Sequence, residues 1–237
     1  MRADRIGRFH TYLDALEAGI DLPYLYNWLE NTAQPNGTGL PIVASFNHPG
    51  TTQYNNWADR TPGVTNIITM LEVINSNTGI HEDAYRAANN AGWKVSPTSG
   101  NDNHGFWGMN WKGTVHNSRI GVLATALTKA GILDAMKNRR TFATRNKNLA
   151  LHYTANGVIM GSTLSTPSTI TFVVTATDPD TGTNNNITLI QIVRPDNTVA
   201  ASFTPPANSF TVNWTSPAIS VGSNKYFYVR ARNAEFG

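Results

Sequence analysis

A chain of 237 residues in which 40% are hydrophobic and 14% charged can bury a substantial core, which excludes a disordered protein and makes two structural units a fair expectation. The net charge of +3 comes from few, scattered cations, so the sequence predicts no nucleic-acid partner. The absence of cysteine excludes disulfides and thiolate ligands, and any metal must be held by His, Asp or Glu.

The chain shows neither a bilayer-spanning apolar run nor a signal-peptide core after Met1, so we expect no membrane span. The cysteine-free, Asn- and Thr-rich composition favours a periplasmic or secreted bacterial enzyme whose leader is missing. The sequence makes no prediction of oligomeric state.

The first part of the chain alternates helical patterns with short apolar runs. Apolar residues three or four apart predict helices over 6–16, 22–29, 82–91 and 129–138. Continuous apolar runs, typical of strands covered on both faces, occupy 41–46, 67–74 and 93–96. This alternation predicts an α/β unit with a parallel sheet over residues 1–147.

The second part, residues 148–237, shows the period-two pattern of half-buried strands. The segments with this pattern are 170–177, 187–193, 210–214 and 226–231, separated by turn-forming clusters at 178–182 and 194–197. They predict a small all-β, Ig-like sandwich. The last segment stops close to Gly237, so we expect this unit to be cut short.

Polar residues follow two of the predicted strands. Asn47-His48-Pro49-Gly50 follows the first apolar run, and the run around Trp93 leads into a Gly-rich loop with Asp102 and His104. In an extended chain these last two side chains share a face, and loops after parallel strands converge on one edge of the sheet. Imidazole and carboxylate suit Zn, Mn or Fe, although each motif alone is also typical of a turn.

Several segments resemble the later half of the PHP-type metallohydrolases, named for polymerase and histidinol phosphatase, and most closely the CehA/McbA, or carbaryl-hydrolase, branch. The segments are 44–50, 71–75, 92–105, 119–124, 140–145, 148–151 and 156–162. The resemblance implies a partial, distorted (β/α)7 TIM-like barrel before the sandwich. The family's opening His-x-His and Asp-His motifs are absent, so the first unit is expected to be the C-terminal part of that barrel.

By this resemblance His48, Asp102 and His104 are metal ligands, each serving a different ion, and Asp102 and His104 belong to the catalytic centre. It implies a metal-dependent hydrolase of esters, carbamates or phosphoesters that acts on a small-molecule substrate through metal-activated water. The family uses two to three divalent ions. Because a catalytic ion needs about three protein ligands, the chain alone is expected to bind metal poorly and to be inactive.

Other polar and aromatic residues could support this site; they are Glu72, Asn101, Asn103, Trp107, Arg119 and Arg140. Glu72, in the middle of a strand, either orients a ligating histidine or forms a structural ion pair. Trp107 either walls the substrate pocket or only packs. The two arginines either hold an anionic substrate group or are ordinary capping or solvated residues.

The alternative function is a carbohydrate- or surface-binding β-sandwich module preceded by a degenerate α/β unit. In this case Trp214, Tyr226 and Tyr228 could stack on sugars, although strand alternation places at least some of them in the core.

Overall fold

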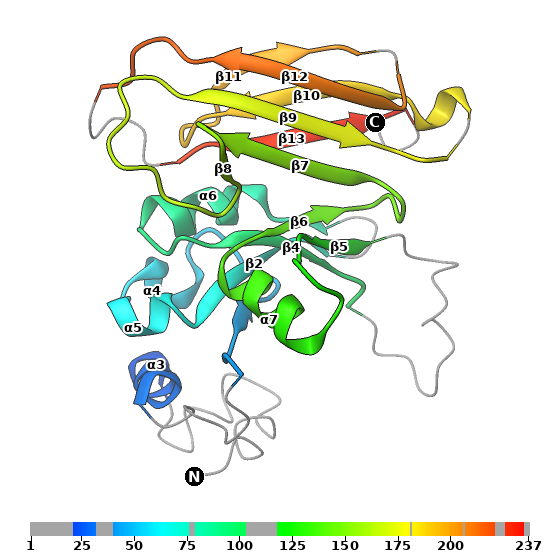
Figure 1. Cartoon of the computed structure of the whole chain (residues 1–237). Coiled ribbons are helices and arrows are strands. Elements are labelled where there is room, and N and C mark those ends of the chain that lie inside the picture. Colours follow the sequence, from blue (N-terminus) through cyan, green and yellow to red (C-terminus); the bar gives the residue numbers. More distant parts are fainter. Residues whose placement is uncertain are drawn as a thin grey trace, which may run out of the picture.

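The computed structural model describes residues 21–31, 40–75, 79–102, 118–180, 182–205, 207–220 and 226–234. Helices and a short sheet form the lower part of Figure 1, and two sheets packed face to face form the upper part.

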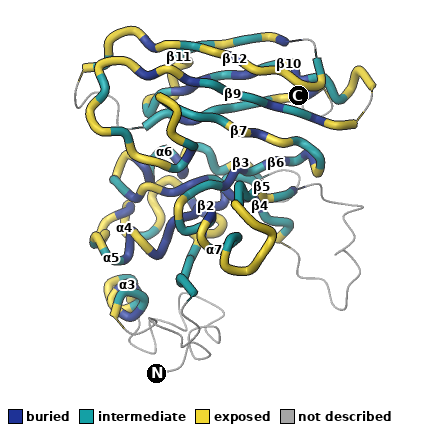
Figure 2. Tube along the Cα trace, viewed as in Figure 1, coloured by how far each residue is buried: buried dark blue, intermediate teal, exposed yellow. Residues whose placement is uncertain are grey.

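The lower sheet is built around one buried strand. Strand β2 (Ile68–Asn75) pairs in parallel with β1 (Ala44–Phe46) on one side and β4 (Ser96–Gly100) on the other. The short strand β3 (Gly79–Ile80) pairs antiparallel with the end of β2. Figure 2 shows β2 as the most continuously buried segment of this part, as expected of a strand covered on both faces.

Short helices surround this sheet: α3 (Leu22–Asn31), α4 (Gln53–Trp57), α5 (Pro62–Thr65), α6 (Glu82–Asn90) and α7 (Lys129–Lys137). Helix α6 carries two acidic residues in its first turn, which suits the positive end of the helix dipole. Trp93 is fully buried and packs edge-on against the rings of Tyr26 and Phe46. These rings belong to one core with buried residues of β1, β2 and α6.

The expectation of a partial (β/α)7 TIM-like barrel is wrong. Strands β5 (Arg119–Val122) and β6 (Thr141–Thr144) flank α7 but pair antiparallel with each other in a separate two-stranded sheet. Among the described residues the parallel strands form an open sheet and no barrel closes. The apolar runs 41–46 and 67–74 overlap β1 and β2, whereas the run 93–96 reaches only the first residue of β4. Burial alone does not specify strand direction or closure.

The upper part is a β-sandwich. One sheet has the order β12 (Ser209–Thr215), β9 (Thr171–Thr177), β7 (Ala150–Ala155) and β8 (Val158–Ile159). The other has the order β11 (Val199–Phe203), β10 (Ile187–Val193) and β13 (Tyr228–Asn233), and a 3-10 turn at Thr183–Asn185 precedes β10. Alternate residues such as Phe172, Val174 and Ala176 point inward and are buried.

The two parts share buried contacts. Phe142 of β6 belongs to the core of the sandwich, whereas Val193 and Tyr228 of the sandwich pack into the core around Trp93. The buried Asn146 side chain, just before β7, donates to the fully buried Asp178 carboxylate at 2.7 Å. The division into two units between residues 147 and 148 therefore stays a prediction. The two parts on either side of it pack closely against each other.

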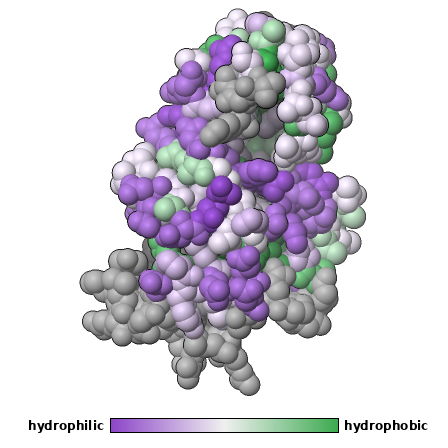
Figure 3. Space-filling model, turned by 90° about the vertical axis from the view of Figure 1, so that its left-hand side faces the viewer, coloured by the Kyte–Doolittle hydropathy of each residue, from purple (hydrophilic) through white to green (hydrophobic). Residues whose placement is uncertain are grey.

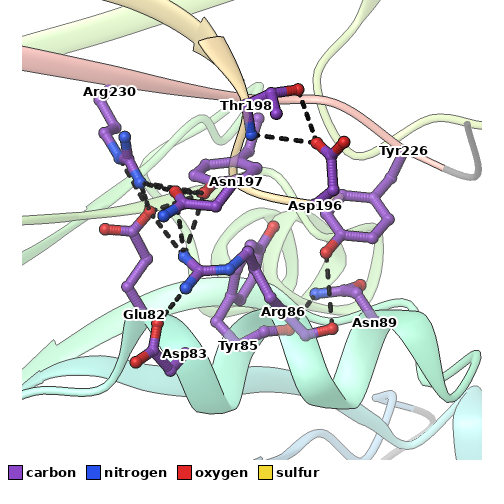
Figure 4. A network of polar contacts seen from close by, with 11 residues as sticks. Glu82, Asp83, Tyr85, Arg86, Asn89, Asp196, Asn197, Thr198, Tyr226 and Arg230 are labelled. Atoms are coloured by element: carbon purple, nitrogen blue, oxygen red, sulfur yellow. Dashed lines mark hydrogen bonds and ion pairs between the residues drawn. The ribbon is translucent and has the colours of Figure 1, made fainter. Parts of the chain in front are cut away.

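A polar network joins α6 to the sandwich (Figure 4). Glu82 Oε1 accepts hydrogen bonds from the Tyr228 hydroxyl at 2.6 Å and from Arg230 Nε at 2.8 Å. Arg86 Nη1 also donates to Glu82 Oε1 and to Asn197 Oδ1, which lies in the turn between β10 and β11. This network holds the start of α6 against β13.

None of the helices within the described ranges has the length and apolar character needed to cross a membrane.

Candidate functional site

The strongest cluster of polar side chains lies where parallel strands end. Two residues after β1 is His48, and two residues after β4 is Asp102, on opposite sides of β2. His48 Nδ1 lies 3.5 Å from Asp102 Oδ2, and the two side chains are 52% and 30% exposed. The structure thus brings these two residues together within reach of solvent.

Glu72 holds the loop that carries His48. The residue is only 6% exposed, and its Oε2 accepts hydrogen bonds from the backbone N–H of His48 at 2.9 Å and from Asn75 Nδ2 at 3.2 Å. Glu72 therefore holds the backbone of the His48 loop rather than the imidazole ring. Burial raises the pKa of the neighbouring Tyr54 to about 12, with the nearby Glu72 charge acting in the same direction.

The backbone is strained at both His48 and Asp102. His48 and Asp102 have φ values of 48° and 46°, a left-handed conformation that costs roughly 1 kcal/mol or more for a residue with a side chain. Residues 54–57 continue in the same conformation after the His48 loop. The Tyr54 hydroxyl donates to the Asn47 carbonyl at 2.9 Å and helps to hold the loop. Such strain is common at functional sites.

The donor set fits part of a metal site. Two ligands of one tetrahedral zinc ion lie about 3.4 Å apart, because each bond is about 2.1 Å long. The separation of His48 and Asp102 matches this spacing. However, the described residues contain no group of three or more His, Asp or Glu side chains that could hold an ion. The third predicted ligand, His104, lies outside the described residues, so the ligand set stays a prediction.

Of the other candidate residues, two lie outside the described residues and three lie within them. Asn103 and Trp107 lie outside the described residues. Asn101 Oδ1 is buried and accepts no hydrogen bond from the described part of the chain. Arg119 donates to the Ser118 carbonyl at 2.8 Å, and the Arg140 guanidinium forms an ion pair with Asp134. The Asp134 pair gives Arg140 a structural role beside α7.

The sandwich aromatics do not form a sugar-stacking surface. The Trp214 ring stacks on buried Phe172, with centroids 5.9 Å apart. Tyr226 and Tyr228 pack against Tyr85 of α6, with centroids 6.4 and 5.6 Å away. These rings belong to the cores and the interface, as strand alternation had indicated for some of them.

A different surface stands out on the sandwich, and the sequence reasoning missed it. Hydroxyl groups pair across the outer face of β9 and β12: Thr171 with Thr215 at 2.9 Å, Thr175 with Thr211 at 2.9 Å, and Thr177 with Ser209 at 3.0 Å. The signal was present as Thr and Ser at alternate positions of two strands. Which of these residues face each other depends on the register between β9 and β12, which the sequence alone does not give.

The surrounding positions complete an uncharged patch, which we call the hydroxyl face. It consists of the outward residues of β7, β9 and β12: Ala150, His152, Thr154, Thr171, Val173, Thr175, Thr177, Ser209, Thr211, Asn213 and Thr215. None is Asp, Glu, Lys or Arg. The opposite sheet, in contrast, carries Arg230 and Arg232 beside β10. The strands of the hydroxyl face lie in front in Figure 1.

The chain matches no family model, no curated protein and no solved structure.

Proposed function

We propose that this protein is a binding module whose β-sandwich attaches to a neutral polysaccharide through the hydroxyl face. The observation that carries this proposal is the register of the three cross-strand hydroxyl pairs on β9 and β12. Because each hydroxyl is already held by its partner, little side-chain entropy is lost when a ligand binds.

The paired hydroxyls keep most of their hydrogen-bonding capacity. Each Ser or Thr hydroxyl has one donor and two acceptor positions, so one bond within a pair leaves one donor and three acceptor positions for a ligand. Along β9, Thr175 and Thr177 lie about 7 Å apart, and Thr171 lies about 13 Å from Thr175 because the Val173–Asn213 pair stands between them. Neighbouring strands lie about 4.8 Å apart. A polymer that presents regularly spaced hydroxyl groups can satisfy such an array at several points at once.

The charge of the face indicates which polymers suit it. His152 is the one titratable side chain of the patch, which holds no Asp, Glu, Lys or Arg. A neutral polysaccharide therefore buries no permanent charge there, whereas an anionic one finds no Lys or Arg partner. Figure 3 shows mainly hydrophilic residues and residues of intermediate hydropathy, with small hydrophobic patches, on the adjoining side of the molecule. Binding to polysaccharide suits the extracytoplasmic location that the composition favours.

The test is a pull-down with insoluble neutral polysaccharides, cellulose and chitin, using a Thr175→Val/Thr211→Val variant. Valine keeps the shape and the strand preference but removes both hydroxyls. The matched control is Thr188→Val, at an exposed position on the opposite sheet. We expect the double variant to lose at least tenfold in affinity and the control to bind as the wild type does. Equal binding by all three proteins, or no binding by the wild type, contradicts the proposal.

A second candidate function is a metal-dependent hydrolase, favoured by the 3.5 Å approach of His48 and Asp102 at the ends of parallel strands. A divalent Zn, Mn or Fe ion at such a site activates water for attack on an ester, carbamate or phosphoester bond. In this chain His48 and Asp102 would hold the ion, and buried Glu72 would fix the His48 loop.

Calorimetric titration with Zn²⁺ tests this candidate, with His48→Ala and Asp102→Ala as variants and His81→Ala as the control. Binding lost in both variants but kept in the control supports it. Zn²⁺ binding that is unchanged by His48→Ala and Asp102→Ala contradicts it. Weak binding by the wild type is expected, because two ligands alone hold an ion poorly.

A further inference from the structure

A cavity of about 570 Å³ lies between α6 with the segment before β4 and the sandwich, away from the hydroxyl face and the His48–Asp102 pair. Its walls come from α6, the segment before β4, strand β7 and the 158–167 segment. Much of the lining is apolar: Ile159, Met160, Leu164, Ile170, Phe172 and Phe227. The volume is within the range of pockets that enclose small organic molecules, about 300–1,000 Å³.

Two tyrosines place hydroxyl groups among these apolar walls. Tyr85 is only 8% exposed, and neither its hydroxyl nor that of Tyr153 has a hydrogen-bond partner among the described residues. Neither hydroxyl is among the fully buried side-chain atoms that lack a partner, so both are open to the cavity and can donate to a ligand acceptor there. Burial raises the pKa of Tyr85 and raises that of Tyr153 to about 12, so both hydroxyls remain protonated donors at neutral pH.

The charges at the cavity have one sign. Arg139, half-buried, lines it and uses Nε to donate to the Gly161 carbonyl at 3.1 Å. Lys94, exposed, lines it too. No Asp or Glu is among the described residues of the lining, and Arg139 forms no ion pair with a carboxylate in the described part of the chain. An anionic ligand in the cavity could therefore form the ion pair that Arg139 does not form with a described carboxylate.

We propose that this cavity binds an amphipathic monoanion, with an apolar body against Met160 and Phe172 and a carboxylate directed at Arg139. The tyrosine hydroxyls supply additional donors to the same acceptor group. The site is independent of the hydroxyl face and of the His48–Asp102 pair, because neither contributes to its lining.

The experiment compares three probes of equal apolar length in calorimetry below their micelle concentrations: decanoate, decanol and decyltrimethylammonium. We expect decanoate to bind at least tenfold more tightly than decanol, and the cation to bind least, because a charge-assisted hydrogen bond in a buried site adds about one to two orders of magnitude. Arg139→Gln should lower decanoate affinity to that of decanol and leave decanol binding unchanged.

Two further variants test the same cavity without changing Arg139, in case Arg139→Gln does not fold. Tyr153→Phe removes one donor and should weaken decanoate several-fold. Ala155→Phe fills part of the cavity and should weaken all decyl probes. Arg232→Gln, on the exposed face of β13, is the matched charge control. Equal affinity for the three probes, or decanoate binding unchanged by Tyr153→Phe and Ala155→Phe, overturns the proposal.

Discussion

The Glu72 carboxylate holds the His48 loop by its backbone: Oε2 accepts the His48 N–H at 2.9 Å from a position inside β2. This contact joins the central strand to the loop after its neighbour β1. It explains how a strained left-handed residue is kept at the strand end, close to Asp102.

Replacing Glu72 by Ala should therefore destabilise the fold by about 1–2 kcal/mol, because the partly buried N–H of His48 and the amide of Asn75 lose a charged acceptor. Glu72→Gln keeps an acceptor oxygen and should cost less. Urea unfolding measures both. A Glu72→Ala protein as stable as the wild type would show that this contact contributes nothing.

Gly100 should be coupled to Glu72. A Cβ atom at Gly100 would lie 2.4 Å from Glu72 Oε1, so Gly100→Ala must displace the carboxylate. We expect a loss of about 1–2 kcal/mol in the wild type and only a few tenths in a Glu72→Ala background. A double-mutant cycle by urea unfolding measures the coupling, and strictly additive losses would rule it out.

The network around Glu82 should stabilise the contact between α6 and the sandwich. Glu82→Ala removes the acceptor shared by Tyr228 and Arg230, and we expect a loss of about 1–2 kcal/mol given the partial exposure of these groups. Limited proteolysis should then release a sandwich-sized fragment faster than from the wild type. Asp83→Ala is the comparison: this residue is 74% exposed and loses only its ion pair with Arg86, so it should cost less than Glu82→Ala.

The buried tyrosines predict alkaline unfolding. Burial raises the pKa of Tyr54 and of Tyr153 from 10.0 to about 12 in the folded protein. The folded state therefore holds these protons more tightly, and the associated stability is fully present below pH 10 and lost as pH rises towards 12. Urea unfolding at stepped pH should show this decline. Stability that stays constant between pH 9 and pH 11.5 would contradict the assignment.

The sequence predicted the positions of several strands but not how all of the strands pair. Period-two patterns placed β9, β10 and β12 to within a residue or two, because half-buried strands alternate. Strands β7 and β11 were missed, since Ala150–Ala155 and Val199–Phe203 mix polar and small residues. The barrel was wrong because the antiparallel pairing of β5 with β6 depends on tertiary contacts.

The same limit applies to the sites. The spacing of His48 and Asp102 from their strands pointed to one edge of the sheet, because carboxyl ends of parallel strands meet there. The cross-strand hydroxyl pairs could not be read in this way, since residues such as Thr175 and Thr211 become neighbours only through strand register.

Polysaccharide binding through the hydroxyl face can be measured by an adsorption isotherm on cellulose or chitin at low and high salt. We expect wild-type binding that hardly changes with ionic strength, because the face carries no Asp, Glu, Lys or Arg. Thr175→Val/Thr211→Val should lower the affinity at least tenfold under both conditions. Binding that collapses at high salt, or that is the same in the double variant and the wild type, would contradict the claim.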